Sequence, residues 1–153
     1  MPNIIKKVLA NVAQALTATE KQRARDNIGI PKYVKLESYD PSISSADDAA
    51  RITDVGDFQI LYYHDNGGSL RLLAENMDMD NPHSLVVSCG NSIDSYANIA
   101  FGSRADLSAV SFSASNGRHQ DMRIIIDGVN FGELSIQWYQ SATPGASQLW
   151  YKV

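Results

Sequence analysis

The texture of the chain changes at Ile30-Pro31, and this change restricts the possible folds more than any other feature. Before it lie most of the strong helix formers. After it, short runs of β-branched and aromatic residues alternate with stretches rich in Ser, Asn, Asp and Gly. Such runs predict β-strands, and the stretches between them predict turns. We therefore expect a mainly β protein, with an N-terminal segment over residues 1–31 and a β-domain over residues 32–153.

Strand character recurs at fairly regular intervals along the second part. The expected strands are Tyr33–Leu36, Phe58–His64, Ser69–Glu75, Leu85–Cys89, Asn98–Phe101, Ala109–Ser113, Met122–Ile126, Leu134–Gln140 and Gln148–Val153. Turn signals separate them at Asp65-Asn66-Gly67-Gly68, Asn116-Gly117 and Asp127-Gly128. Residues Ser44–Arg51 predict one helical turn, capped by Ser45 or Asp47. Many short strands with such turns predict an antiparallel β-sandwich or a jelly-roll-like fold.

Composition excludes several classes of protein. The chain has 153 residues, of which 44% are hydrophobic and 20% charged, which is ordinary for a globular protein. A formal net charge of -4 argues against nucleic-acid binding, which needs a basic surface. The single cysteine, Cys89, cannot form an internal disulfide, and its apolar strand favours a core position over a nucleophile.

The first residues carry an apolar stripe with helical spacing. Its members are Ile4, Ile5, Val8, Leu9, Val12 and Leu16. The pattern fits an amphipathic helix, or two a/d pairs of a short coiled coil. Such a helix is too short to be stable alone, so it packs either on its own domain or on another protein. Asn11 and Gln14 interrupt the apolar stretch from Val8 to Leu16, so it is not a convincing secretion signal, and it is too short to span a membrane.

A short helix is predicted over residues 18–28. Thr17 and Glu20 form a capping box, in which each side chain accepts a hydrogen bond from the backbone N–H of the other. Gly29 can adopt the positive φ that ends a helix, and Pro31 prevents its continuation.

This helix lies within a motif that resembles the Q-x-L-T…A-R-x-N-I-G linker of bacteriophage fibre proteins, which include tail fibres and head fibres. The matching residues are Gln14, Leu16, Thr17, Gln22, Ala24, Arg25, Asn27, Ile28 and Gly29, and Glu20 completes the capping box within them. The resemblance covers residues 14–29 only. It implies a linker between an N-terminal attachment segment and a β-domain, in a protein that is typically trimeric. Arg25 could then bridge protomers, or belong to a solvated helix face.

The resemblance implies a structural virion protein, made in the cytoplasm of the bacterial host. A chain of 153 residues is short for a tail fibre and has no evident repeats, which favours a head fibre, its anchor or a capsid decoration. The expected partners are capsid or tail proteins and two further copies of the chain, with no nucleic acid and no membrane. The alternative is a lectin-like tip module that binds glycans on the host surface.

No motif for catalysis is present, so we expect neither an enzyme nor a cofactor. His64, His83 and His119 are scattered near predicted turns, where exposed histidines without a catalytic partner are usual. Asp78, Asp80 and Asn81 could offer oxygen ligands to Ca²⁺, but the glycine and final glutamate of an EF-hand loop are missing. A polar loop is therefore the preferred interpretation.

Adjacent aromatic residues occur at Tyr62-Tyr63, Trp138-Tyr139 and Trp150-Tyr151. Side chains alternate across a strand, so each pair places one ring on each face. With Ile136 pointing inward, Trp138 also points inward and Tyr139 outward. Tyr63, Tyr139 and Trp150 are therefore candidates for a ligand or interface surface, and the alternative is cross-strand packing on a half-buried face.

Overall fold

The computed structural model describes residues 17–20, 23, 33–110, 112, 118–140 and 147–153. The chain divides into two compact units, Met1–Lys32 and Tyr33–Val153. This boundary lies one residue from the one expected.

The first unit contains the predicted capping box. Thr17 N donates to Glu20 Oε2 at 2.8 Å, and Glu20 N donates to Thr17 Oγ1 at 3.2 Å, so this prediction is confirmed. Residues 18–20 and 23 are helical. The other motif positions (Gln14, Leu16, Gln22, Ala24, Arg25, Asn27, Ile28 and Gly29) lie outside the described residues, as does the whole apolar stripe from Ile4 to Leu16.

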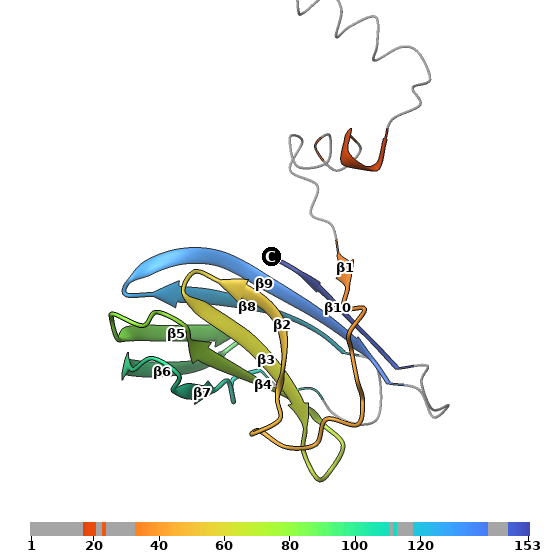
Figure 1. Ribbon diagram of the computed structural model, residues 1–153, viewed down its shortest axis with the longest axis horizontal. Coiled ribbons are helices and arrows are strands. Elements are labelled where there is room, and N and C mark those ends of the chain that lie inside the picture. The colour runs from red at the N-terminus through yellow and green to blue at the C-terminus, as the bar shows by residue number, and fades with distance from the viewer. Residues whose placement is uncertain (1–16, 21–22, 24–32, 111, 113–117, 141–146) are drawn as a thin grey trace, which may run out of the picture. The chain divides into compact units, whose positions relative to one another are not determined.

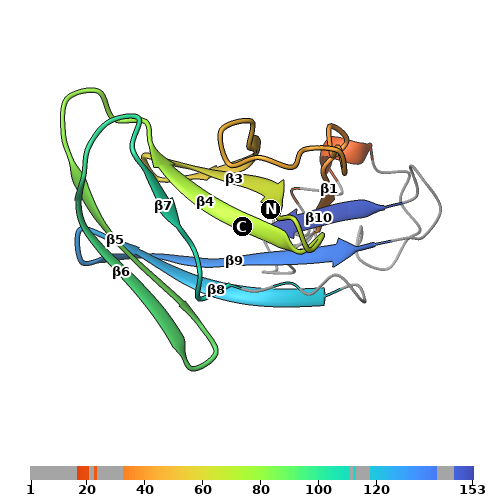
Figure 2. The same ribbon diagram turned by 90° about the horizontal axis from the view of Figure 1, so that it is seen from below.

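The second unit is a mainly β domain with antiparallel sheets, as predicted. One sheet has the strand order β1-β10-β9-β8-β5-β6, and the other has the order β2-β3-β4-β7. The strands are β1 (Val34–Lys35), β2 (Ala50–Val55), β3 (Phe58–His64), β4 (Leu70–Asn76), β5 (His83–Cys89), β6 (Ser92–Ile99), β7 (Arg104–Asp106), β8 (Arg118–Ile126), β9 (Val129–Tyr139) and β10 (Gln148–Lys152). The sheets form two layers (Figures 1 and 2).

The core lies between these layers and follows the period-2 alternation of strands. In β9, the side chains of Leu134, Ile136 and Trp138 are at most 1% exposed, whereas that of Tyr139 is 57% exposed. Trp138 therefore points inward and Tyr139 outward, as predicted. From the other sheet, Phe58, Ile60 and Tyr62 of β3 join the same cluster. Burying each such side chain contributes roughly 1.5–3 kcal/mol before the entropy of folding is subtracted.

One expected helical turn is wrong. Residues 46–48 form hydrogen-bonded turns rather than a helix, and strand β2 begins at Ala50. The register of β2 against β3 shifts between Arg51 and Thr53. This irregularity places the buried Ile52 and Val55 three residues apart. The irregularity interrupts the period-2 alternation that marks a strand, and β2 was not among the strands predicted from the sequence.

The edge strands also differ from expectation. β6 occupies Ser92–Ile99 rather than Asn98–Phe101, and β7, at Arg104–Asp106, was not predicted. Both are edge strands, and most of the side chains of β6 are exposed, so hydrophobic alternation is weak there. The expected strand Ala109–Ser113 is wrong for its described residues: Val110 and Phe112 are buried outside any strand.

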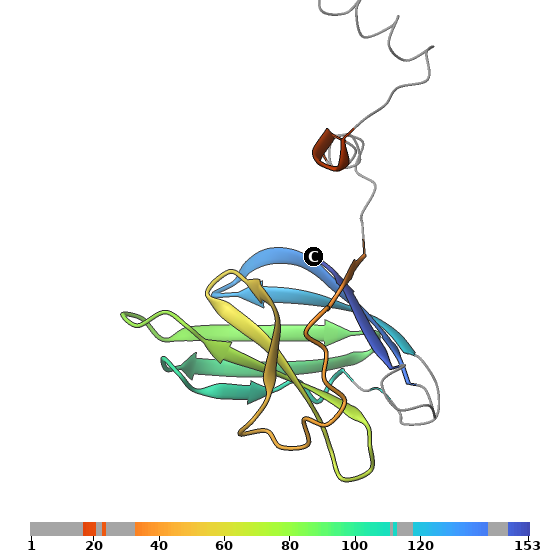
Figure 3. The same cartoon turned by 45° about the vertical axis from the view of Figure 1, so that its right-hand side comes forward.

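The turns show which hairpin signals were sound. Asp127 and Gly128 join β8 to β9 with φ values of 49° and 79°, as the predicted two-residue hairpin requires. The predicted loop around Gly67 joins β3 to β4 (Figure 3). Asn116-Gly117 lies outside the described residues.

Candidate functional site

Several loops meet at one end of the sandwich, on the left in Figure 1. They are the β2–β3 turn, the β4–β5 loop, the β6–β7 loop and the β8–β9 turn. Backbone hydrogen bonds join them: Met77 N donates to Asp57 O at 2.9 Å, and Gly102 N donates to Asn76 O at 2.8 Å. The side chain of Asn76 is fully buried and donates to the carbonyl oxygens of Asn81 and Ile99. We call this region the loop end.

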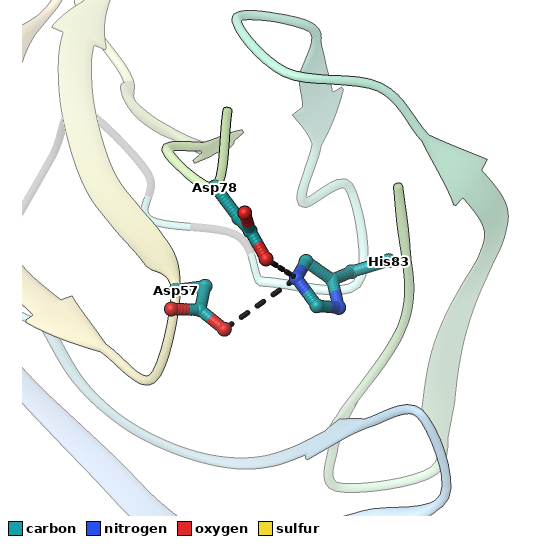
Figure 4. Close-up of side chains that lie close together, drawn as sticks. All are labelled: Asp57, Asp78 and His83. Atoms are coloured by element: carbon teal, nitrogen blue, oxygen red, sulfur yellow. Dashed lines mark hydrogen bonds and ion pairs between the residues drawn. The ribbon is translucent and has the colours of Figure 1, made fainter. Parts of the chain in front are cut away.

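His83, at the start of β5, is the centre of a cluster of carboxylates at the loop end (Figure 4). Its Nε2 lies 2.8 Å from Asp78 Oδ2 and 3.4 Å from Asp57 Oδ2. Its Nδ1 lies 2.5 Å from Asp127 Oδ2. The imidazole side chain is only 12% exposed, and the ring of Phe58 meets it edge-on at 6.2 Å. One histidine therefore contacts carboxylates from three separate connections between strands.

Local backbone structure fixes two of these carboxylates. Asp127 occupies the left-handed turn between β8 and β9, and its Oδ1 accepts a hydrogen bond from Ser84 N at 2.8 Å. Asp78 Oδ1 accepts from Asp80 N at 2.9 Å and from Asn81 N at 3.3 Å. Asp78 thus organises its own loop with one oxygen, Asp127 ties its turn to Ser84 of β5 with one oxygen, and each presents its other oxygen to His83.

The cluster shifts the pKa values of its members toward their charged forms. The pKa of His83 is raised above its ordinary value, first by the hydrogen bond to Asp127 and then by that to Asp78. The pKa of Asp78 is lowered to about 2, mainly by the backbone bond from Asp80 and then by His83. Hydrogen bonds from Ser84 and His83 also lower the pKa of Asp127. The charged forms of His83, Asp78 and Asp127 therefore stabilise one another.

Three of these side chains also form a possible set of metal ligands. Ligand atoms of Asp57, Asp78 and His83 lie within 4.8 Å of one another. Two ligands of a tetrahedral zinc ion, each about 2.0–2.1 Å from the metal, are separated by roughly 3.3 Å. The 2.8 Å between His83 Nε2 and Asp78 Oδ2 is shorter and matches a charge-assisted hydrogen bond. The contact between His83 and Asp78 therefore has the geometry of a hydrogen bond and not the ligand spacing of a zinc site.

The residues considered from the sequence as Ca²⁺ ligands, Asp78, Asp80 and Asn81, form hydrogen bonds within their own loop. The carboxylate of Asp78 is occupied by Asp80, Asn81 and His83, and the Asn81 amide donates back to Asp78 Oδ2 at 3.2 Å. Asp78, Asp80 and Asn81 instead line a shallow cavity of about 330 Å³, together with the exposed Met79 and Phe101. The arrangement is that of a hydrogen-bonded polar loop, the interpretation preferred from the sequence.

The aromatic candidates separate onto different faces. Tyr139 lies directly opposite Gln148 on β10, and Trp150, two residues further along β10, shares that outer face. The indole Nε1 of Trp150 donates to Gln148 Oε1 at 3.2 Å. Tyr63 lies on the outer face of the other sheet, opposite Arg71. Tyr139 and Trp150 can therefore contribute to one surface, and Tyr63 cannot.

The expectation of exposed loop histidines is wrong for His64, which is 7% exposed within β3. Its Nδ1 lies 3.0 Å from Ile43 O, and its Nε2 lies 2.9 Å from the Tyr39 hydroxyl. His119 is half-exposed on β8, where it contacts Asp121 at 2.9 Å and the Tyr33 hydroxyl at 2.9 Å. Sequence spacing gave no signal for the contacts of His83 with Asp57 and Asp127, which lie far from it in the chain, whereas Asp78 is only five residues away.

Comparison with protein-family models, with curated proteins and with solved structures finds no match for this chain. Among the described residues, no helix is long and apolar enough to cross a membrane. Arguments about function therefore depend on the residues of the chain itself.

Proposed function

We propose that this chain is a structural protein of a bacteriophage particle, without enzymatic activity. Its N-terminal segment attaches it to a capsid or tail protein, and its β-domain projects as part of a short trimeric fibre or appendage. The length of 153 residues favours a head fibre, its anchor or a capsid decoration over a tail fibre. The assignment to a virion depends on the resemblance of residues 14–29 to the fibre linker.

The observation that carries this proposal is the division of the chain. Every described member of the hydrophobic core lies between Ile52 and Leu149, within the second unit. The contact boundary after Lys32 falls just beyond the motif. The reciprocal capping bonds of Thr17 and Glu20 support a defined helix start within it. The proposal assigns attachment to the first unit and projection to the second.

The chemistry of the histidines is consistent with a non-enzymatic role. Both ring nitrogens of His83 face carboxylates, those of Asp57, Asp78 and Asp127. The thiol of Cys89 is buried and donates to Gln120 Oε1 at 3.0 Å. Burial raises the pKa of this thiol, which opposes formation of the reactive thiolate.

Deletion of residues 1–16 tests the proposal. If the apolar stripe is an attachment element, the shortened protein keeps the melting temperature of its β-domain and is no longer incorporated into phage particles. If the stripe instead packs on the β-domain, deletion removes buried aliphatic side chains at roughly 1.5–3 kcal/mol each and lowers the melting temperature. Incorporation of the shortened protein at the level of the full chain would refute the proposal.

The second candidate is a glycan-binding tip, which is favoured by the shared face of Tyr139 and Trp150. Rings exposed beside amide groups can stack on a sugar while the amides bind its hydroxyls. In binding assays with a panel of host surface oligosaccharides, Tyr139→Ala combined with Trp150→Ala should weaken binding by roughly tenfold or more. Tyr63→Ala, on the other sheet, is the matched control and should have no effect. Equal loss in both variants would contradict this assignment.

A further inference from the structure

We propose that protonated His83 is a pH-sensitive clasp that holds the β2–β3, β4–β5 and β8–β9 connections together, and that its deprotonation frees the β4–β5 loop. This inference concerns the loop end and is independent of the role in the virion.

The hydrogen-bond geometry requires two protons on the ring. Both ring nitrogens of His83 face carboxylate oxygens, Nε2 toward Asp78 at 2.8 Å and Nδ1 toward Asp127 at 2.5 Å. Ionised carboxylates only accept hydrogen bonds, and a neutral imidazole has a single N–H to donate. Loss of one proton therefore breaks one bond and turns a nitrogen lone pair toward a negative oxygen.

The charges around the ring increase the free-energy cost of deprotonating His83. Asp57, Asp78 and Asp127 are the charged groups that contact the ring, one from each connection, and Phe58 of β3 covers it without charge. Without the imidazolium, these carboxylates repel one another across the loop end. Water screens the pair of His83 and Asp78 least, because these side chains are 12% and 19% exposed, whereas Asp57 and Asp127 are about half exposed.

The β4–β5 loop is the segment that loses an interaction when His83 is deprotonated. Asp78 is its contact with His83, and Met77 N donates to Asp57 O next to it. Met77 and Met79 are 41% and 77% exposed, so the loop has little apolar burial of its own. At its base, the buried Asn76 bonds to Asn81 O and Ile99 O regardless of the charge on His83. Release is therefore local, with the sandwich intact.

The direction of the pH dependence follows from the pKa shifts. Because the pKa of His83 is raised on folding, its contribution is fully present below the unfolded value of about 6.5. It is lost as the pH rises through the higher folded value. The lowered pKa of Asp78, about 2, gives a contribution present above about 3.9 and lost as the pH falls toward 2. The clasp is therefore closed from about pH 4 to beyond pH 6.5.

Proton NMR of the full chain tests the clasp, because only three histidine rings must be followed. We expect the His83 ring to titrate with a midpoint above about 6.5. Across that midpoint, hydrogen-exchange protection of the Met77–Asn81 amides should fall, while that of the β8 and β9 amides is retained. Asp127→Asn should lower the midpoint. Asparagine keeps the left-handed turn and can still accept from Ser84 N, so the variant should fold.

His119→Gln is the matched control, because it removes another histidine–aspartate pair at a distance from the loop end. It should leave the midpoint and the loop protection unchanged. A His83 midpoint at or below about 6.5, or loop protection that is constant across the midpoint, would overturn the proposal. So would a titration that changes on addition of EDTA, because a metal ion rather than a proton would then hold the carboxylates.

Discussion

At the scale of single residues, a chain of hydrogen bonds through Tyr39 satisfies polar groups inside the sandwich. Trp138 Nε1 donates to the Tyr39 hydroxyl at 2.9 Å, and that hydroxyl lies 2.9 Å from His64 Nε2. Burial raises the pKa of Tyr39 to about 12, so the hydroxyl keeps its proton and can donate it to His64. The other nitrogen of His64 then donates to Ile43 O. These hydrogen bonds give the polar atoms of Trp138 and His64 partners in an apolar environment.

Tyr39→Phe should therefore destabilise the domain by roughly 1–3 kcal/mol, because it leaves the buried indole N–H and the His64 nitrogen unpaired. Denaturant unfolding monitored by tryptophan fluorescence measures this loss. Tyr139→Phe removes the same hydroxyl from a ring that is 57% exposed, and it should change the free energy of unfolding very little. A loss of equal size in both variants would contradict the role assigned to Tyr39.

At the scale of elements, the β2–β3 turn is fitted closely to the opposite sheet. Gly56 has a φ of 55°, and a Cβ atom placed on it would lie 2.9 Å from Ile126 Cδ1 and 3.0 Å from Phe131 Cε1. Ile126 belongs to the core at 3% exposure, so its methyl group has little freedom to move. The turn that carries Asp57 toward His83 therefore depends on the absence of a side chain at position 56.

Gly56→Ala should cost roughly 1–2 kcal/mol for the left-handed backbone and a further roughly 1–3 kcal/mol for overpacking. Gly102→Ala is the matched comparison, because Gly102 has a φ of 72° but no atom within 4 Å of its Cβ position. It should show only the first cost. Thermal unfolding measures the stability lost in each variant. An equal loss at both positions would show that the contact with Ile126 does not contribute to the cost at position 56.

At the scale of the whole molecule, the protein combines a β-domain with its own core and an N-terminal unit bounded at Lys32. Static light scattering of the full chain should give about three times the chain mass of 16.8 kDa, if the linker motif assembles trimers as its resemblance implies. Removal of residues 1–31 should reduce this mass to that of one chain. A full-length monomer, or a trimer that survives the deletion, would contradict the assembly through this segment.

Sequence alone determined the fold class, the hairpins with strong turn chemistry and the inward position of Trp138, because these depend on local alternation and on the φ preferences of a few residues. It also determined the capping box of Thr17 and Glu20, whose partners are three residues apart. It failed at β2, where a bulge displaces the alternation, and at edge strands such as β6, where few side chains are buried.

Only the tertiary structure decided which distant residues became neighbours. His83 and Asp127 are 44 residues apart in the chain, and they meet because β5 pairs with β8 near their ends. The antiparallel register likewise placed Tyr139 beside Gln148 and left Tyr63 on the other sheet. No periodicity encodes such contacts, because strand order and register arise from the packing of both layers around one core.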